Sequence, residues 1–235
     1  MNGCRNNTKA KLASHLDFAN HSAQSTEAQI RELCRKVLQY GFNAAFLNPC
    51  WVKFARQQLG DRGKVGTVVA FPLGQDTQDV KILAAIDAAR RGAAELDVSM
   101  NVGLFKAGKE DQVLAEMKAV VTSVKEVKAS VLVKFIIETG YLTPKEIQKA
   151  AQLVLAAGAD FVKTNSGWGP RGASLEDVKL IRQAVGQKIK LKVAGGIDTY
   201  QEAIAFIQAG VDRIGTSHAV EIIERKQKRG GGEKE

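Results

Sequence analysis

Residues 157–163 read AGADFVK, a glycine that follows a helical pattern and then a short apolar strand that ends in a lysine. The same unit occurs three more times, as QYGFNAAFL at 39–47, RGAAELDV at 91–98 and AGVDRIG at 209–215. Each glycine stands where a helix can end in the left-handed cap conformation. The repeat therefore predicts helices and strands that alternate along the chain.

Further strand patterns lie between the repeated units. They read LASHLD at 12–17, VGTVVAF at 65–71, VLVKFII at 131–137 and KLKVA at 190–194. Strands that alternate with helices form a parallel sheet. With the four repeated units they make eight strands, which favours a closed barrel over an open doubly wound sheet. We predict an α/β fold, a single-domain (β/α)8 TIM barrel.

Helix starts fit this order. Ser25–Glu27, Ser174–Asp177 and Thr199–Glu202 each place a hydroxyl residue before acidic side chains, which is typical of an N-cap. Thr143–Glu146 adds a proline at the first helical position. These four stretches are predicted to open helices.

Length and composition agree with one domain. The chain has 235 residues, 45% hydrophobic and 25% charged, which suits a globular fold, and about 250 residues is typical of a barrel. We expect the barrel domain to span residues 1–224. Residues 225–235 are charged and lack an apolar residue, which predicts a disordered tail.

A net charge of +9 favours anionic ligands. No basic face with interleaved aromatic residues is visible, which argues against a nucleic-acid ligand.

Residues 1–5 lack the apolar core of a signal peptide, and no apolar run reaches the roughly 20 residues of a membrane helix. Three cysteines without metal-ligand spacing fit a reducing compartment. A cytoplasmic location is expected, with no metal or other cofactor.

Two lysines end strands that are predicted to be neighbours. Lys163 follows Phe161 and Val162, and Lys192 precedes Val193 and a double glycine. Adjacent strands lie about 4.8 Å apart, and two ammonium groups about 4 Å apart repel by about 4 kcal/mol. Such repulsion would lower the pKa of one lysine by about 3, giving a neutral amine for Schiff-base chemistry. The alternative is two solvated lysines at strand ends.

Other polar residues end the predicted strands at the same barrel mouth. They are Asp17, Asn48, Asp97 and Lys134. Asp97 lies between Leu96 and Val98, so it is either a buried carboxylate held by structural partners or a group that transfers protons. The sequence leaves both interpretations open.

Glycine-rich loops follow the last two strands. Gly195 and Gly196 follow one, and Gly215 and Ser217 mark the other. In barrels this is the usual position of a phosphate site, where glycines let backbone N–H groups approach the anion; a tight turn is the alternative. Arg171 lies in a loop that either binds an anion or forms a surface turn. His15, His21 and His218 lack zinc spacing and are expected to be structural.

These motifs together resemble the deoxyribose-phosphate aldolases, class I aldolases with a barrel fold. The resemblance runs from about Leu12 to about Ile223. It is carried by NP at 48–49, FPLG at 71–74, ELDV at 95–98, KFIIETG at 134–140, AGADFVKT at 157–164, GGI at 195–197 and IGTS at 214–217.

The resemblance implies a Schiff base at Lys163, a pKa-lowering role for Lys192, proton transfer by Asp97, and support from Asp17. It implies reversible cleavage of 2-deoxyribose 5-phosphate to acetaldehyde and glyceraldehyde 3-phosphate, without a metal, in deoxyribonucleotide catabolism. Homo-oligomers are expected. The residues expected to bind substrate or phosphate are Asn48, Lys134, Gly167, Arg171, Gly195, Gly196, Gly215 and Ser217.

The chain also departs from the family pattern near the acceptor and the phosphate. Residues 18–21 read FANH where the family usually has HTLL, which removes a threonine hydroxyl, and Phe46 replaces a cysteine. Asp198 stands where arginine is common, and His218 where a second serine is frequent. Three functions therefore stay open: this aldolase, a lysine-imine aldolase with a keto donor or an unphosphorylated acceptor, and a non-aldolase or isomerase-type phosphate-binding barrel.

Overall fold

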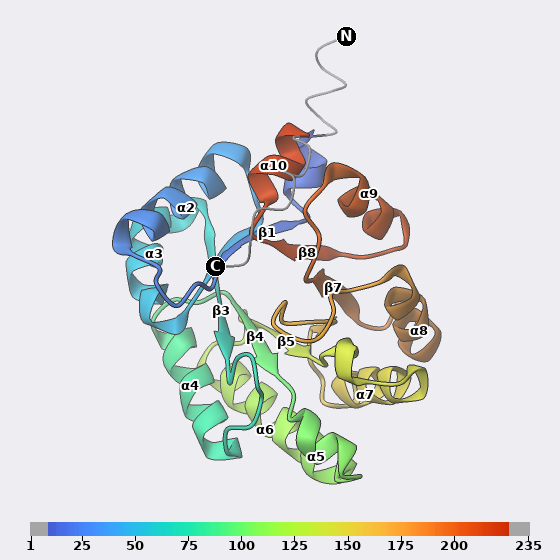
Figure 1. The fold of residues 1–235 in the computed structure, drawn as a ribbon. Helices are drawn as coiled ribbons and strands as arrows, with labels where there is room; N and C mark the ends of the chain where they lie inside the picture. The colour runs from blue at the N-terminus through green and yellow to red at the C-terminus, as the bar shows by residue number, and fades with distance from the viewer. Residues whose placement is uncertain (1–8, 226–235) are drawn as a thin grey trace.

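The computed structural model describes residues 9–225, and these form a closed barrel of eight parallel strands joined in chain order, β1 to β8. Figure 1 shows the helices as an outer ring around the strands. The strands are β1 (Leu16–Asn20), β2 (Ala44–Leu47), β3 (Lys64–Val69), β4 (Glu95–Ser99), β5 (Leu132–Ile136), β6 (Phe161–Lys163), β7 (Lys190–Ala194) and β8 (Arg213–Thr216). The predicted TIM barrel is confirmed.

The outer ring consists of one or two helices after each strand. They are α2 (Glu27–Tyr40), α3 (Val52–Leu59), α4 (Gln78–Arg90), α5 (Val102–Lys106), α6 (Glu110–Val127), α7 (Pro144–Ala156), α8 (Leu175–Val185), α9 (Tyr200–Gln208) and α10 (Ala219–Glu224). Short 3₁₀ turns occupy Pro49–Trp51, Gly60–Arg62 and Thr139–Tyr141.

The first strand lies later than the sequence pattern indicates. Residues 9–13 are helical, and β1 begins at Leu16 instead of Leu12. Leu12 and Ala13 are buried all the same. An apolar pair buried on a helix gives the same short signal as one buried in a strand, so the predicted boundary is wrong.

The four predicted helix starts are confirmed. Thr26, Thr143, Ser174 and Thr199 each cap a helix in a reciprocal capping box, with the side chain three residues later returning to the cap backbone. The four repeat glycines also have positive φ, from +70° at Gly41 to +107° at Gly92. The helix boundaries are therefore set locally.

The helix α10 ends at Glu224, and the domain boundary expected there stays a prediction because residues 226–235 lie outside the described part of the chain. The predicted tail lies almost entirely outside the described residues, as does Cys4. Cys34 and Cys50 are free thiols. Among the helices of residues 9–225, none has the length and apolar character needed to cross a membrane.

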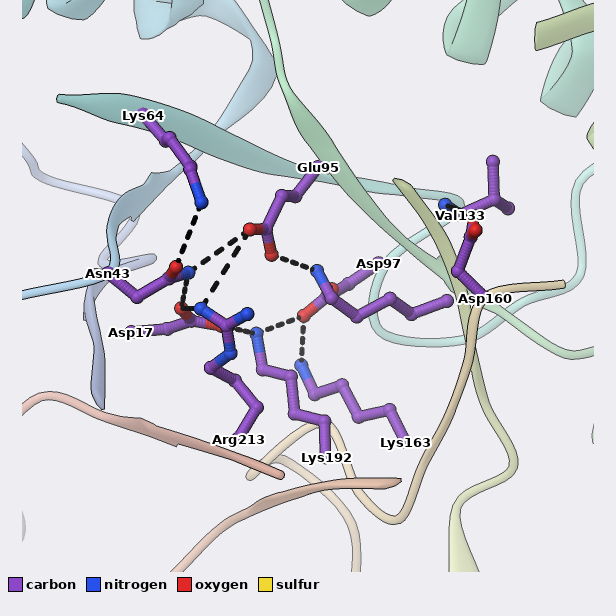
Figure 2. Close-up of polar contacts among 11 residues, drawn as sticks. Asp17, Asn43, Lys64, Glu95, Asp97, Val133, Asp160, Lys163, Lys192 and Arg213 are labelled. Atoms are coloured by element: carbon purple, nitrogen blue, oxygen red, sulfur yellow. Dashed lines mark hydrogen bonds and ion pairs between the residues drawn. The ribbon is translucent and has the colours of Figure 1, made fainter. Parts of the chain in front are cut away.

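The two faces of the barrel wall have different chemistry. Residues such as Leu96, Val98 and Leu191 are fully buried in the apolar layer that packs against the helices. Most barrels fill their interior with branched apolar side chains. Here Asp97 and Lys192, on the alternate positions, are fully buried in the barrel interior (Figure 2).

One aromatic ring fills part of that interior. Phe46 on β2 lies opposite Gly66 on β3, and a Cβ atom at Gly66 would come within 2.3 Å of the Phe46 ring. The glycine therefore provides the space that the phenylalanine occupies.

We expect Gly66→Ala to destabilise the barrel by about 1–3 kcal/mol through overpacking. Chemical denaturation would measure this loss in the free energy of unfolding. Combined with Phe46→Leu, the same alanine substitution should cost less. Gly103→Ala is the control, because its Cβ would approach the flexible Gln75 side chain at 3.2 Å. An equal cost of Gly66→Ala in both backgrounds would contradict the packing argument.

Candidate active site

Two lysines meet at the carboxyl ends of neighbouring strands. Lys163 on β6 is in register with Lys192 on β7. Their Nζ atoms lie 2.9 Å and 2.8 Å from the same oxygen, Oδ2 of Asp97 (Figure 2). The predicted pairing of these lysines is confirmed, and a carboxylate lies between them.

A deeper layer of charge supports this arrangement. Lys192 Nζ also lies 2.7 Å from Asp17, while Lys134 Nζ lies 3.0 Å from Asp97 Oδ1 and 2.6 Å from Glu95. These four side chains and that of Asp97 are fully buried. With Lys163, three lysines contact three carboxylates, and these pairings are what make so many buried charges tolerable.

The sequence interpretation missed three members of this network. Glu95 pairs with Lys134, Asn43 donates to Asp17 at 2.7 Å and to Glu95 at 3.1 Å, and Arg213 lies 3.6 Å from Asp17. Glu95 precedes Asp97 by two residues on β4 and so shares its face. This alternation along β4 is the sequence feature that could have identified Glu95 as a member of the network. The sequence around Asn43 and Arg213 contains no comparably clear feature.

Burial is the main cause that lowers the pKa of Lys163, which falls to about 8. The neighbouring Asp97 carboxylate opposes this shift, and repulsion from Lys192 and then Lys134 adds to it. The predicted direction is therefore confirmed, but the predicted cause is not the largest one. The sequence indicated repulsion between lysines, whereas the closed barrel first removes water from the amine.

The pKa values of the two aspartates move in opposite directions. Burial would raise the pKa of Asp97, but its contacts with Lys134, Lys163 and Lys192 outweigh this and hold it well below the usual range. Burial raises the pKa of Asp17, and attraction to Lys192 opposes that rise. Asp97 is therefore the anion at the centre of the network.

A cavity of about 790 Å³ opens above this network. Asp97, Lys163 and Lys192 line it. Five of the predicted substrate or phosphate residues also line it: Gly167, Gly195 and Gly196 from the loops after β6 and β7, Gly215 from β8, and Ser217 from the loop after β8. The structure thus brings the proposed nucleophile and the glycine loops into one chamber.

The other predicted site residues lie elsewhere. Asp17 and Lys134 are fully buried beneath the chamber. Asn48 donates to the Ser22 carbonyl oxygen at 3.3 Å and lines an adjoining cavity. Arg171 donates to both carboxylate oxygens of Asp177, at 2.6 Å and 2.8 Å. The Arg171 guanidinium is therefore already paired with a carboxylate of α8.

Two pairs of polar side chains lie at the chamber rim. His218 Nδ1 lies 3.1 Å from Asp198, and Lys36 of α2 lies 3.8 Å from Glu32. Within residues 9–225, no group of three His, Cys, Asp or Glu side chains is placed to share a metal ion.

Comparison with known proteins gives the chain a family. The model of the DeoC/LacD family aldolases matches residues 11–218. The chain belongs to this family.

Two relatives of this DeoC/LacD family chain carry the name deoxyribose-phosphate aldolase. The protein from Thermoanaerobacter sp. (strain X514) is 44% identical over 218 residues, which is 92% of this chain and 97% of the relative. The protein from Aciduliprofundum boonei is 46% identical over 215 residues, which is 91% of this chain and 96% of the relative.

Solved structures with this fold include two similar family members. "QR15, an Aldolase" superposes with a TM-score of 0.85 at 39% identity, covering 91% of this chain and 94% of that one. The tetrameric deoxyribose phosphate aldolase from Aeropyrum pernix superposes with a TM-score of 0.84 at 30% identity, covering 94% of each chain.

In this DeoC/LacD family chain, reductive trapping of acetaldehyde should speed up as pH rises through about 8. The amine is charged below that pKa and neutral above it, and only the neutral amine attacks a carbonyl. Lys192→Met should move the midpoint upward, because it removes a repelling charge and leaves Asp97 to pair more strongly with Lys163. Mass spectrometry of cyanoborohydride-treated protein would give both profiles.

Lys190→Met is the matched control, since Lys190 is exposed at the opposite end of β7. It should leave the midpoint unchanged. A midpoint that stays fixed or falls in Lys192→Met would contradict the electrostatic role of Lys192.

Proposed function

We propose that this chain is a class I aldolase that reversibly cleaves 2-deoxy-D-ribose 5-phosphate to acetaldehyde and D-glyceraldehyde 3-phosphate through an imine at Lys163. The observation that carries the proposal is the shared contact of Lys163 and Lys192 with one oxygen of Asp97 at the chamber floor. The names of the 42–46% identical relatives supply the substrate.

The first step adds the neutral Lys163 amine to the substrate aldehyde. The nitrogen gives one proton to the carbonyl oxygen, that oxygen takes a second proton from solvent, and water departs to leave the protonated imine. Asp97 accepts from Lys163 at 2.9 Å, so it is the group placed to carry these protons. Because the attacking Lys163 amine is neutral, Asp97 faces two ammonium groups, Lys134 and Lys192, during the attack, and its affinity for a proton is higher than when Lys163 is charged.

The second step breaks the carbon–carbon bond. The hydroxyl on the third carbon loses its proton and becomes the aldehyde of the departing product. The electron pair of the bond between the second and third carbons moves into the protonated imine and gives an enamine. Protonation of the second carbon and hydrolysis then release acetaldehyde and restore the Lys163 amine. Lys192, held by Asp17 and Asp97, lies beside the imine.

The phosphate is assigned to the loops after β7 and β8. Gly195 and Gly196 have φ values of +91° and +75°, so their backbone turns in a way that favours glycine. Gly172 packs closely on Gly195, where a Cβ would meet the carbonyl oxygen at 2.3 Å. Backbone N–H groups in such loops bind anions. The Asp198 carboxylate contacts His218, so this side chain points toward the imidazole and not toward the proposed phosphate site.

One observation favours a second candidate, an aldolase with an unphosphorylated acceptor. Among the described residues that line the chamber there is no arginine, and the lysines are Lys36, Lys163 and Lys192. Lys36 belongs to α2 and already contacts Glu32. A phosphate at the glycine loops would thus have backbone groups alone to bind it, with the Asp198 carboxylate nearby.

We further propose that the substrates are small aldehydes and sugar phosphates, and that the chain forms homo-oligomers. The tetrameric relative from Aeropyrum pernix supports the oligomer. Free Cys34 and Cys50 are compatible with a reducing compartment such as the cytoplasm.

Lys163→Leu tests the imine. We expect borohydride with acetaldehyde to add the mass of one ethyl group at Lys163 in the unaltered protein and none at this position in the variant. Cleavage of 2-deoxyribose 5-phosphate should fall by about 10³-fold or more. Circular dichroism would verify the fold. A folded, unaltered protein that is not trapped would rule out the aldolase.

An acceptor panel tests the phosphate. The backbone cradle predicts a higher kcat/KM for D-glyceraldehyde 3-phosphate than for D-glyceraldehyde, by about tenfold or more for one charge-assisted set of hydrogen bonds. Asp198→Asn should increase this preference by removing a negative charge at the rim. Equal rates for the two acceptors would favour the unphosphorylated candidate.

A further inference from the structure

His21 is a polar residue of the chamber wall that the proposed mechanism does not use. It follows β1 and lines the same cavity as Lys163. Its imidazole packs on Phe71, with ring centroids 5.2 Å apart. Lys163 Nζ lies 5.9 Å from the centroid of the same Phe71 ring. One aromatic side chain therefore contacts both the imidazole and the nucleophile.

The surroundings of His21 select one form of the ring. Nδ1 is buried and has no hydrogen-bond partner. A proton on a buried nitrogen without an acceptor is costly, so the neutral ring carries its proton on Nε2. Burial lowers the pKa of His21 to about 3, the charge on Lys163 adds to this shift, and the Asp97 carboxylate and a hydrogen bond with the Asn48 side chain oppose it. His21 is therefore an uncharged N–H donor at the chamber wall.

Asn20 and Ser22 are the other polar side chains of this segment that line the chamber. Asn20 Oδ1 accepts from Ser25 Oγ at 2.8 Å and from the Ser22 backbone N–H at 3.1 Å. Ala19, which also lines the chamber, has no polar side-chain atom. His21 is thus a donor of this segment whose ring packs on Phe71, the aromatic side chain beside the Lys163 amine.

The chemistry of the proposed reaction determines which part of the substrate the His21 N–H can bind, so this step rests on the proposed function. Acetaldehyde has one heteroatom, and that oxygen leaves as water when the imine forms. The bound donor half then offers only carbon and the imine nitrogen. Every other hydrogen bond from the chamber wall must reach the acceptor half, which carries hydroxyl groups.

We propose that His21 is a specificity-determining residue that donates a hydrogen bond from Nε2 to the hydroxyl next to the carbonyl of the acceptor aldehyde. A wall group that binds a hydroxyl selects against an acceptor lacking it, because the buried donor is then left unpaired. The ligand class is a 2-hydroxyaldehyde. The low basicity of the ring separates this role from that of a general base.

The test compares lactaldehyde with propanal as acceptors for acetaldehyde, since these differ only in the 2-hydroxyl group. His21→Leu should lower the ratio of kcat/KM for lactaldehyde to that for propanal by about tenfold or more. His21→Phe, which keeps a ring on Phe71, should do the same. His21→Gln, which keeps an N–H donor, should restore part of the ratio.

Gln24→Leu is the matched control, because Gln24 is an exposed polar residue of the same loop; its ratio should equal that of the unaltered protein. Borohydride trapping of acetaldehyde alone should proceed equally in all these variants. A ratio unchanged in both His21→Leu and His21→Phe, or an equal loss for both acceptors, would overturn the proposal. Failure of trapping in the unaltered protein would instead refute the aldolase, and this inference with it.

Discussion

The structure depends on one carboxylate, Asp97, that holds three ammonium groups inside a closed sheet. Its Oδ2 contacts Lys163 and Lys192, and its Oδ1 contacts Lys134. Removing one member of a buried ion pair typically costs about 3–5 kcal/mol, because the remaining charge has lost its solvent and its partner. Here the same carboxylate contacts three lysines, so the position of Asp97 is required both for the stability of the barrel and for the geometry of the site.

Barrel closure is what makes this arrangement possible. The charged residues come from β1, β4, β5, β6 and β7, and their side chains meet because each strand is in fixed register with the next. A slip by one residue in β4 would turn Asp97 outward and bring Leu96 inward. The outward apolar residues packed against the helices prevent that slip. Packing on the outside of the barrel therefore fixes the chemistry on the inside.

Much of this was readable in the sequence. Glycine caps, capping boxes and strand patterns predicted the barrel, and the ends of β6 and β7 predicted that Lys163 and Lys192 are neighbours. What the sequence could not show was contact between distant strands. The sequence predicts that Lys134 and Arg171 bind substrate, whereas Lys134 lies beneath the chamber and Arg171 is paired with Asp177. Likewise the main cause of the shifted Lys163 pKa is burial, which depends on closure and not on spacing.

Phe46 shows how this chain satisfies its buried ammonium groups without further carboxylates. The Lys192 Nζ lies 3.5 Å from the centroid of the Phe46 ring, and the Lys134 Nζ lies 4.7 Å from it. An ammonium over an aromatic face gains about 2 kcal/mol when desolvated. Lys192 thus meets Asp17, Asp97 and the ring, which suits an ammonium with three donors. An additional carboxylate would have raised the pKa of Lys163, whereas the uncharged ring stabilises Lys192 and leaves the nucleophile easy to deprotonate.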